Sequence, residues 1–164
     1  MRIARIGDRV CSMARAVAVV GDSWTLLVLR ELFLRARRFD EFESCTGMAP
    51  YLLSRRLAKL VRHGIVRRAR YQAHPPRFEY RLTDKGLDLY AFVVSLSRWG
   101  DRWENGRRGP GATLTHKRCG HAMEPTLVCS GCGDPLHARD VRVELSAPVA
   151  AERRRLRAGQ KAAR

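Results

Sequence analysis

The chain has 164 residues, 45% of them hydrophobic, which is enough for one domain of ordinary size and an appended segment. Its 32 Lys and Arg residues outnumber 16 Asp and Glu residues, and the resulting net charge of +16 and pI near 11.0 favour a polyanionic partner. No segment approaches the roughly 20 apolar residues of a membrane span and no signal-peptide pattern opens the chain, so we expect a cytoplasmic protein.

Composition and charge divide the chain into segments. Residues 1–104 have a net charge of +9 and alternate apolar with charged positions, as a folded domain does. Residues 105–112 are a linker rich in Gly and Pro, and residues 113–146 form a small module with most of the cysteines. Residues 147–164 have a net charge of +5 and no aromatic residue, so we expect a disordered tail or a frayed helix. We find no internal repeat.

Three short helices are predicted at the start of the chain. The first extends from about Arg5 to Val20 and is closed by Gly21, after which Asp22 or Ser23 can cap the next. The second covers residues 25–35 with an apolar stripe made by Leu26, Leu27, Leu29, Leu32 and Phe33. The third, shorter helix covers residues 39–46 and ends at Gly47.

A fourth helix over about residues 50–63 has two unlike faces. Pro50 is tolerated in its first turn, because that position has no N–H partner within the helix. At 100° per residue, one side is apolar, and its members are Leu52, Leu53, Leu57, Leu60 and Val61. The other side is largely polar and cationic, and its members are Tyr51, Ser54, Arg55, Ala58, Lys59 and Arg62.

A β-hairpin follows over about residues 65–82. Phe78, Tyr80 and Leu82 alternate with charged residues, which is the pattern of a half-buried strand. Its partner is the run from Ile65, and the two prolines between them mark the turn. A long last helix, capped at Thr83 or Asp84, then extends to Trp103. Its apolar residues are a candidate dimer interface, namely Leu87, Tyr90, Val94, Leu96 and Trp99.

This order of elements predicts a mainly α fold with a small β-hairpin, a winged helix-turn-helix. The fourth helix then occupies the recognition position, where a helix lies in the major groove of DNA. Arg55 and Arg56 can form bidentate pairs with guanine or phosphate, although Arg56 is at the edge of the apolar side and can instead support the fold. The candidate DNA-binding residues are Tyr51, Ser54, Arg55, Arg56, Lys59 and Arg62 in the helix and Arg67, Arg68, Arg70 and Arg77 in the wing.

Four runs carry a resemblance to a known family: GDSWTLLVLRELFLRARRFDEF, APYLLSRRLAKLVRHGIVRR, PPRFEYRLTDKG and WGDRW. In this order they resemble the HxlR-type winged helix-turn-helix transcriptional regulators of bacteria, in the MarR-like superfamily. The resemblance covers nearly all of residues 11–104. It implies a homodimer that pairs through its first and last helices, binds a palindromic operator in double-stranded DNA and regulates nearby genes.

The module after the linker contains a candidate structural zinc site. His116 and Cys119 form an HxxCG motif and Cys129 and Cys132 form a CxxCG motif, as in the paired turns of a zinc ribbon. Four protein ligands would leave no open position for catalysis. His121 and His137 are rival candidates for the histidine ligand, and buried thiols without metal are the alternative. A similar ribbon follows the last helix in some relatives of the family.

Cys11 and Cys45 lie outside that module. The resemblance places Cys11 near the first helix, where some relatives have a cysteine that senses electrophiles or oxidants as a thiolate. Those relatives commonly have a proline next, whereas Ser12 follows here; Cys11 is thus a possible redox sensor, with an inert packed thiol as the alternative. Cys45 is expected to be inert.

Two other classes of function compete with a DNA-binding regulator. We expect no enzyme, because the sequence contains no nucleophile elbow, phosphate loop or paired carboxylates. A basic zinc-ribbon protein that binds RNA or the ribosome would explain the charge and the cysteines. It would not explain the hairpin or the long last helix, so sequence-specific duplex binding is the preferred prediction.

Overall fold

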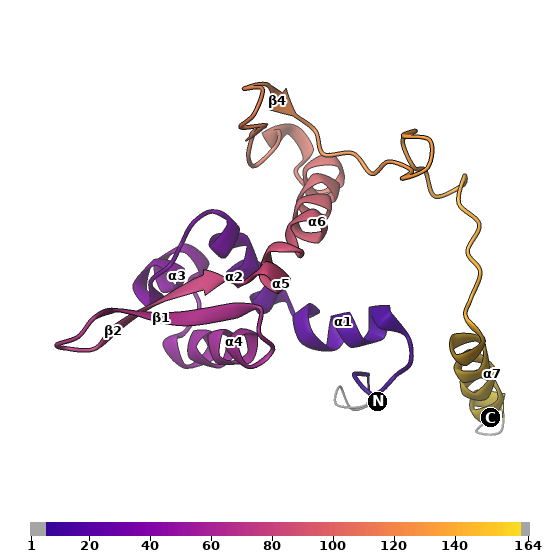
Figure 1. The fold of residues 1–164 in the computed structure, drawn as a ribbon, viewed down its shortest axis with the longest axis horizontal. Helices are drawn as coiled ribbons and strands as arrows, with labels where there is room; N and C mark the ends of the chain where they lie inside the picture. The colour runs from indigo at the N-terminus through magenta and orange to yellow at the C-terminus, as the bar shows by residue number, and fades with distance from the viewer. Residues whose placement is uncertain (1–5, 162–164) are drawn as a thin grey trace.

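The computed structural model of the protein describes residues 6–161 (Figure 1). The first part is a winged domain, with α1 (Ser12–Val20), α2 (Ser23–Phe33), α3 (Phe39–Thr46), α4 (Pro50–Arg62), β1 (Val66–Gln72), β2 (Arg77–Leu82), α5 (Asp84–Leu87) and α6 (Tyr90–Trp103). The second part, the extension, comprises the 3-10 turn η2 (Gly106–Arg108), the strands β3 (Leu114–Thr115) and β4 (Ala122–Met123), and α7 (Ala147–Lys161). None of the helices in the described residues is long and apolar enough to cross a membrane.

The core lies where α2, α3 and α4 meet the first strand of the hairpin. The side chains with no exposed surface are Thr25, Val28, Leu29, Leu32, Phe42, Leu53, Leu57 and Leu60. Three of them, Leu53, Leu57 and Leu60, recur at helical spacing along α4, as predicted from its apolar side. Burying each such side chain stabilises the fold by about 1.5–3 kcal/mol relative to leaving it in water.

The helix boundaries follow from local hydrogen bonds. Asp22 caps α2, because its carboxylate accepts a hydrogen bond of 3.0 Å from the backbone N–H of Thr25, as predicted. Glu41 holds the start of α3 by accepting from the backbone N–H groups of Arg37, at 2.6 Å, and Arg38, at 2.9 Å. Gly47 ends α3 with a φ of 65°. Residues 47–49 are therefore the turn of the helix-turn-helix.

The hairpin is the predicted wing. β1 and β2 are antiparallel, and the register pairs Val66 with Leu82 and Arg70 with Phe78. The backbone N–H of Tyr80 donates to the carbonyl of Arg37 at 2.7 Å, which attaches the base of the hairpin to the segment before α3. The other end of the hairpin projects away from the helices (Figure 1).

Two predicted helices differ from the observed ones. The first was expected from about Arg5, which lies outside the described residues; within them it begins only at Ser12, because Gly7 and Asp8 occupy turns that such residues favour. The long last helix is divided into α5 and α6. A side chain on Gly86 would collide with the carbonyl of Ile65, so α5 packs directly against the start of the wing, and the chain turns before α6 crosses α2.

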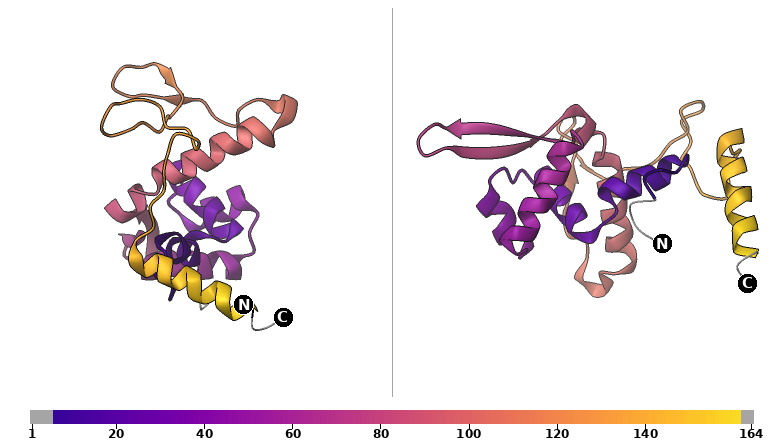
Figure 2. Two further views of the ribbon diagram at one scale, coloured as in Figure 1. Left: turned by 90° about the vertical axis from the view of Figure 1, so that its right-hand side faces the viewer. Right: turned by 90° about the horizontal axis from the view of Figure 1, so that it is seen from below.

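The extension leaves the end of α6 and contains little regular structure before α7. The first hairpin pairs Leu114 with Met123, and a single bridge pairs Val128 with Pro135 in a second turn. Of the two expectations for the tail, disorder or a frayed helix, the structure has a helix, α7, and its Ala and Arg residues have high helix propensity. Figures 1 and 2 show α7 apart from the wing and on the side of α1, where the backbone N–H of Val10 donates to Glu152 at 3.3 Å.

Candidate nucleic-acid interface

The outward face of α4 is exposed as the helical spacing predicts. The exposed members are Tyr51, Ser54, Arg55, Ala58 and Arg62. Tyr51 is 73% exposed, and its hydroxyl accepts a hydrogen bond of 3.4 Å from the Arg55 guanidinium, whose carbon lies 5.7 Å from the ring centre. These two side chains therefore form one surface unit, with an aromatic ring and a planar cation in the first turns of the helix.

Arg56 and Lys59 are placed differently, because both face the N-terminus of α2. The Arg56 Nε atom is 3.1 Å from one carboxylate oxygen of Asp22, and the Lys59 Nζ atom is 3.6 Å from the other. Their side chains are only 25% and 21% exposed. The Arg56 contact is an ion pair without hydrogen-bond alignment. The structure thus assigns Arg56 and Lys59 a supporting contact, and their role in binding DNA remains a prediction.

Asp22 links α2 to α4. Partial burial favours its protonated form, but hydrogen bonds from the side chain and backbone of Thr25 and the charges of Arg56 and Lys59 outweigh burial and lower the pKa of Asp22 below its ordinary value. The Thr25 hydroxyl donates to the carboxylate at 2.5 Å. The ionised carboxylate therefore caps α2 and at the same time fixes one flank of α4.

The C-terminal end of α4 is held by a cation, Lys85. The Lys85 ammonium group donates to the carbonyl of His63, the residue after the helix, at 2.8 Å. Burial and the nearby charges of Arg62, Lys59 and Lys85 lower the pKa of His63, so its ring is neutral at pH 7. The positive potential at this end of the helix consequently comes from Arg62, Lys59 and Lys85.

The four arginines predicted for the wing fall into two groups. Arg68 lies with its guanidinium carbon 3.6 Å from the centre of the Phe78 ring, and Arg70 donates to the carbonyl groups of Gln72 and Ala73 at the turn. These two residues stabilise the hairpin itself. Arg67 and Arg77 are exposed, and within residues 6–161 no hydrogen bond or ion pair engages their side chains. They are the wing cations that are most available to phosphates.

Sequence reasoning missed two residues beside the predicted interface. Asp22 was predicted only as a helix cap, since no local pattern relates it to cations more than thirty positions away. Arg38, at the start of α3, lies 4.9 Å from the centre of the Tyr71 ring in β1. This contact adds an exposed cation between the helix-turn-helix and the wing.

The four candidate zinc ligands lie in two pairs. The His116 Nδ1 atom is 3.2 Å from the Cys119 sulfur. In the second pair, the backbone N–H groups of Cys132 and Gly131 and the Cys132 side chain lower the pKa of the Cys129 thiol. The structure does not join the pairs, because the described residues contain no cluster of three or more potential metal ligands. As placed, the residues therefore provide two half-sites rather than a complete tetrahedral site.

The remaining cysteines are single thiols. Cys11 is half-buried at the N-cap of α1, and Cys45 is exposed in α3. The Arg15 backbone N–H donates to the Cys11 carbonyl at 3.2 Å. The structure does not test the redox prediction for Cys11.

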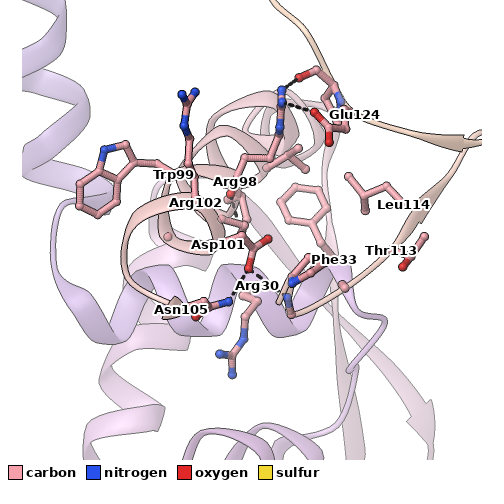
Figure 3. Close-up of a pocket in the computed structure, with 18 of the residues that line it drawn as sticks. Arg30, Phe33, Arg98, Trp99, Asp101, Arg102, Asn105, Thr113, Leu114 and Glu124 are labelled. Carbon is pink, nitrogen blue, oxygen red and sulfur yellow. Dashed lines mark hydrogen bonds and ion pairs between the residues drawn. The ribbon is translucent and has the colours of Figure 1, made fainter. Parts of the chain in front are cut away.

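Several large apolar side chains of α6 are exposed. Phe92, Leu96, Trp99 and Trp103 are 46%, 43%, 55% and 62% exposed, whereas Val94, predicted for the same stripe, is buried in the domain core. A hollow of about 1430 Å³ lies between α2, α6 and the first part of the extension, and Figure 3 shows residues that line it. At its edge Asp101 accepts hydrogen bonds from the Asn105 side chain and the backbone of Gly111, which hold the linker against α6.

A helix-turn-helix with an exposed cationic second helix and an arginine-bearing hairpin defines a winged-helix DNA-binding protein. The family model described as HxlR-like helix-turn-helix matches residues 19–108, which include the helix-turn-helix, the wing and α6. The chain therefore belongs to the HxlR-like helix-turn-helix family. Members of this family are transcriptional regulators and not enzymes, as predicted.

Similar proteins agree with this assignment. The helix-turn-helix transcriptional regulator Rv3095 of Mycobacterium tuberculosis, itself uncharacterised, is 43% identical over 133 residues, which cover 81% of this chain and 84% of its own. The crystal structure of PA1607, a candidate transcription factor, has a TM-score of 0.77 at 32% identity over 87% of this chain and 99% of its own. The oxidised form of the redox regulator HypR has a TM-score of 0.53 at 30% identity over 56% of this chain and 96% of its own.

Proposed function

We propose that this protein is a homodimeric transcriptional regulator that binds a palindromic operator in double-stranded DNA. The observation that carries the proposal is the outward face of α4, where Tyr51 and Arg55 form an exposed unit on a helix whose other face is locked into the core. A fixed helix with exposed polar side chains suits base reading in the major groove. As a protein that acts on bacterial DNA, it would work in the cytoplasm.

Each candidate contact has a proposed role. Tyr51, Ser54 and Arg55 would face base edges near the start of α4, while Arg62 would bind phosphate near its end. Arg67 and Arg77 would bind the adjacent backbone or minor groove. Arg56, Lys59, Arg68 and Arg70 would act mainly by fixing the positions of α4 and the wing, because Arg56 and Lys59 are held by Asp22 and Arg68 and Arg70 by the hairpin itself.

The dimer would bury the apolar stripe of α6 together with α1. Four large side chains on α6 are exposed, as are Met13 and Val17 on α1, at 72% and 44%. Exposed apolar side chains of this kind are candidates for burial against a second copy of the chain. A two-fold dimer would place two copies of α4 in successive major grooves about 34 Å apart, which corresponds to an inverted repeat in the operator. Light scattering at micromolar concentration should give the mass of two chains.

The decisive experiment is selection of bound duplexes from a random DNA library at physiological salt. We expect enrichment of one inverted repeat, and a variant with Tyr51→Ala and Arg55→Ala should lose that enrichment while it remains folded. A matched variant with two arginines of α7 replaced, Arg154→Ala and Arg157→Ala, should enrich the same repeat. Enrichment of no sequence by the wild-type chain, or tighter binding to RNA than to the best duplex, would refute the proposal and favour the RNA-binding alternative.

Cys11 remains the candidate for redox control of this regulator. HypR is a redox regulator, and its similarity covers 56% of the present chain. Cys11 lies at the start of α1, the helix that we assign to the dimer interface. A thiol oxidant should then weaken binding to the selected operator in the wild-type chain but not in Cys11→Ser. Cys45→Ser is the matched control and should retain the response; equal responses in both variants would exclude Cys11 as the sensor.

A further inference from the structure

The extension contains the same hairpin twice, thirteen positions apart. In the first hairpin, residues 114–123, Leu114 pairs with Met123 and Thr115 with Ala122. At the corresponding positions of the second hairpin, residues 127–136, the Leu136 N–H donates to Leu127 and Val128 bridges to Pro135. The two segments share Leu, Cys and Gly at matching positions, so the repeat is visible mainly in the backbone pairing. This corrects the sequence-based conclusion that the chain has no internal repeat.

The turns of the two hairpins are closed by the same two hydrogen bonds. His116 donates its N–H to the carbonyl of His121 at 2.9 Å, as Cys129 does to Asp134 at 2.8 Å. The glycine N–H at the fifth position then donates back to the first residue, from Gly120 to His116 and from Gly133 to Cys129. Both glycines have positive φ, 74° and 81°, a conformation that other residues rarely adopt.

Each turn brings together, on the same side of the turn, the side chains of its first and fourth residues. His116 and Cys119 occupy these positions in the first hairpin, with 3.2 Å between imidazole nitrogen and sulfur, and Cys129 and Cys132 occupy them in the second. The backbone N–H of Gly131 points to the Cys129 sulfur at 3.4 Å. A turn that exposes two soft donors and directs an N–H group at sulfur is suited to hold one side of a metal ion.

We propose that the two turns close on a single Zn²⁺, with His116, Cys119, Cys129 and Cys132 as its four ligands. Three thiolates and one imidazole favour Zn²⁺ over Mg²⁺ or Ca²⁺, and a complete set of protein ligands makes the site structural. The linker between the hairpins, residues 124–126, is short enough to keep the turns close. The pairs are separate in this structure, so binding requires the two hairpins to move toward each other.

The repeat also selects the histidine ligand. His116 occupies the position of Cys129, whereas His121 occupies the position of Asp134, whose backbone closes the turn. His137 follows the second hairpin, so no residue of the first hairpin corresponds to it as a metal ligand. Of the three histidines in the module, only His116 is therefore placed by the repeat at a ligand position.

Apart from their backbone hydrogen bonds, the two hairpins have few stabilising contacts. Within residues 113–146 every side chain is exposed or half-buried, so the module has no apolar core of its own, and isolated hairpins this short are unstable in water. The joint between the hairpins is anchored on α6, where Arg98 donates to the carbonyl of Pro125 and to the Glu124 carboxylate at 2.7 Å (Figure 3). Closure on a metal would consequently fix the whole module relative to α6.

The test uses the full chain, freed of metal under reducing conditions and without DNA. Titration with Co²⁺ should give the visible spectrum of a tetrahedral thiolate complex, saturating at one ion per chain, and one equivalent of Zn²⁺ should abolish it. Zn²⁺ should also protect three of the five thiols from a thiol reagent. Failure to bind either ion, or a spectrum without sulfur-to-cobalt charge transfer, would overturn the proposal and leave the DNA-binding proposal unaffected.

Matched variants identify the ligands. Cys129→Ser and His116→Ala should each lose or strongly alter the tetrahedral spectrum, whereas His121→Ala and Cys45→Ser should retain it. Loss of the spectrum in His121→Ala with retention in His116→Ala would contradict the assignment made from the repeat. If Cys129→Ser does not fold, the thiol count and the cobalt stoichiometry of the wild-type chain still decide whether the site exists.

Discussion

The winged domain and the extension are stabilised in different ways. Within residues 6–158, buried side chains occur only between Val20 and Val94, and the extension contributes none. The winged domain is thus held by apolar burial, whereas the hairpins of the extension are held by backbone hydrogen bonds at their turns. From this difference we infer that the hydrophobic core is enough to stabilise the winged domain. The extension has no such core, so we expect a bound ligand or a partner surface to stabilise it.

The largest expected effect of a single substitution is in the core of the winged domain. Leu57→Ala removes a side chain with no exposed surface and should lower the free energy of unfolding by about 2–5 kcal/mol. Val143→Ala, at a position that is 76% exposed in the extension, should change it by less than about 0.5 kcal/mol. Denaturant unfolding followed by circular dichroism measures both. Equal costs would mean that the two parts share one core.

The next effect concerns DNA rather than stability. Arg55→Ala should weaken binding to the selected operator by about 1–3 kcal/mol and relax the preference at one base pair if Arg55 reads a base. Arg142→Ala removes an exposed arginine from the extension and should leave the preference unchanged. Fluorescence anisotropy with operator and random duplex separates the outcomes: an equal loss on both would reduce Arg55 to a phosphate contact.

A smaller effect is expected from the carboxylate that joins α2 to α4. Asp22→Ala removes a helix cap and should lower the free energy of unfolding by about 0.5–2 kcal/mol. Because the pKa of Asp22 is lowered on folding, its contribution is complete above the unfolded value of about 3.9 and is lost as pH falls through the folded-state pKa.

A pH series tests that sign. As pH falls below about 4, the wild-type chain should lose stability more steeply than Asp22→Asn, which retains a capping group but cannot titrate. The control is Asp134→Asn, at an exposed position of the extension. It should leave the pH dependence of winged-domain unfolding unchanged. A steeper dependence in Asp22→Asn than in the wild-type chain would contradict the lowered pKa.

The smallest expected effect is that of removing α7. A chain ending at Ser146 should bind the operator with a lower salt dependence, because each lost phosphate contact reduces the slope of log K against log salt by about 0.9. Its preferred sequence should stay the same. An unchanged slope would show that α7 does not reach the DNA and would favour a role at a protein surface, such as the contact with the segment before α1.

The winged domain was predictable because its signals are local. Gly47 and Pro50 mark the turn and the next helix, and Leu53, Leu57 and Leu60 mark the buried side of α4. The break before α6 was missed, since it depends on the contact of Gly86 with the distant carbonyl of Ile65. The contacts of Asp22 with Arg56 and Lys59 were missed for the same reason, although Arg56 was recognised as a residue that can support the fold.

In the extension the sequence predicted the two turns but not the hairpins that contain them. The spacing of His116, Cys119, Cys129 and Cys132 indicated two paired turns, and the structure forms both turns without joining them. The hairpin repeat was not detectable by composition, because backbone hydrogen bonds define it and few letters are shared. For α7 the sequence left disorder and a frayed helix both open, since a charged segment with few apolar residues gives no sign of what it packs against.

The carboxylate of Asp22 also constrains how this scaffold can diverge or be engineered. Thr25, Arg56 and Lys59 are all bound to one acidic group that lies outside the recognition helix. A relative that loses Asp22 would have two partly buried cations without a counter-charge, so these four positions should be inherited and substituted together. Replacing α4 with the helix of another regulator, to change which operator sequence is recognised, would for the same reason require a residue at position 22 that can pair with the new helix.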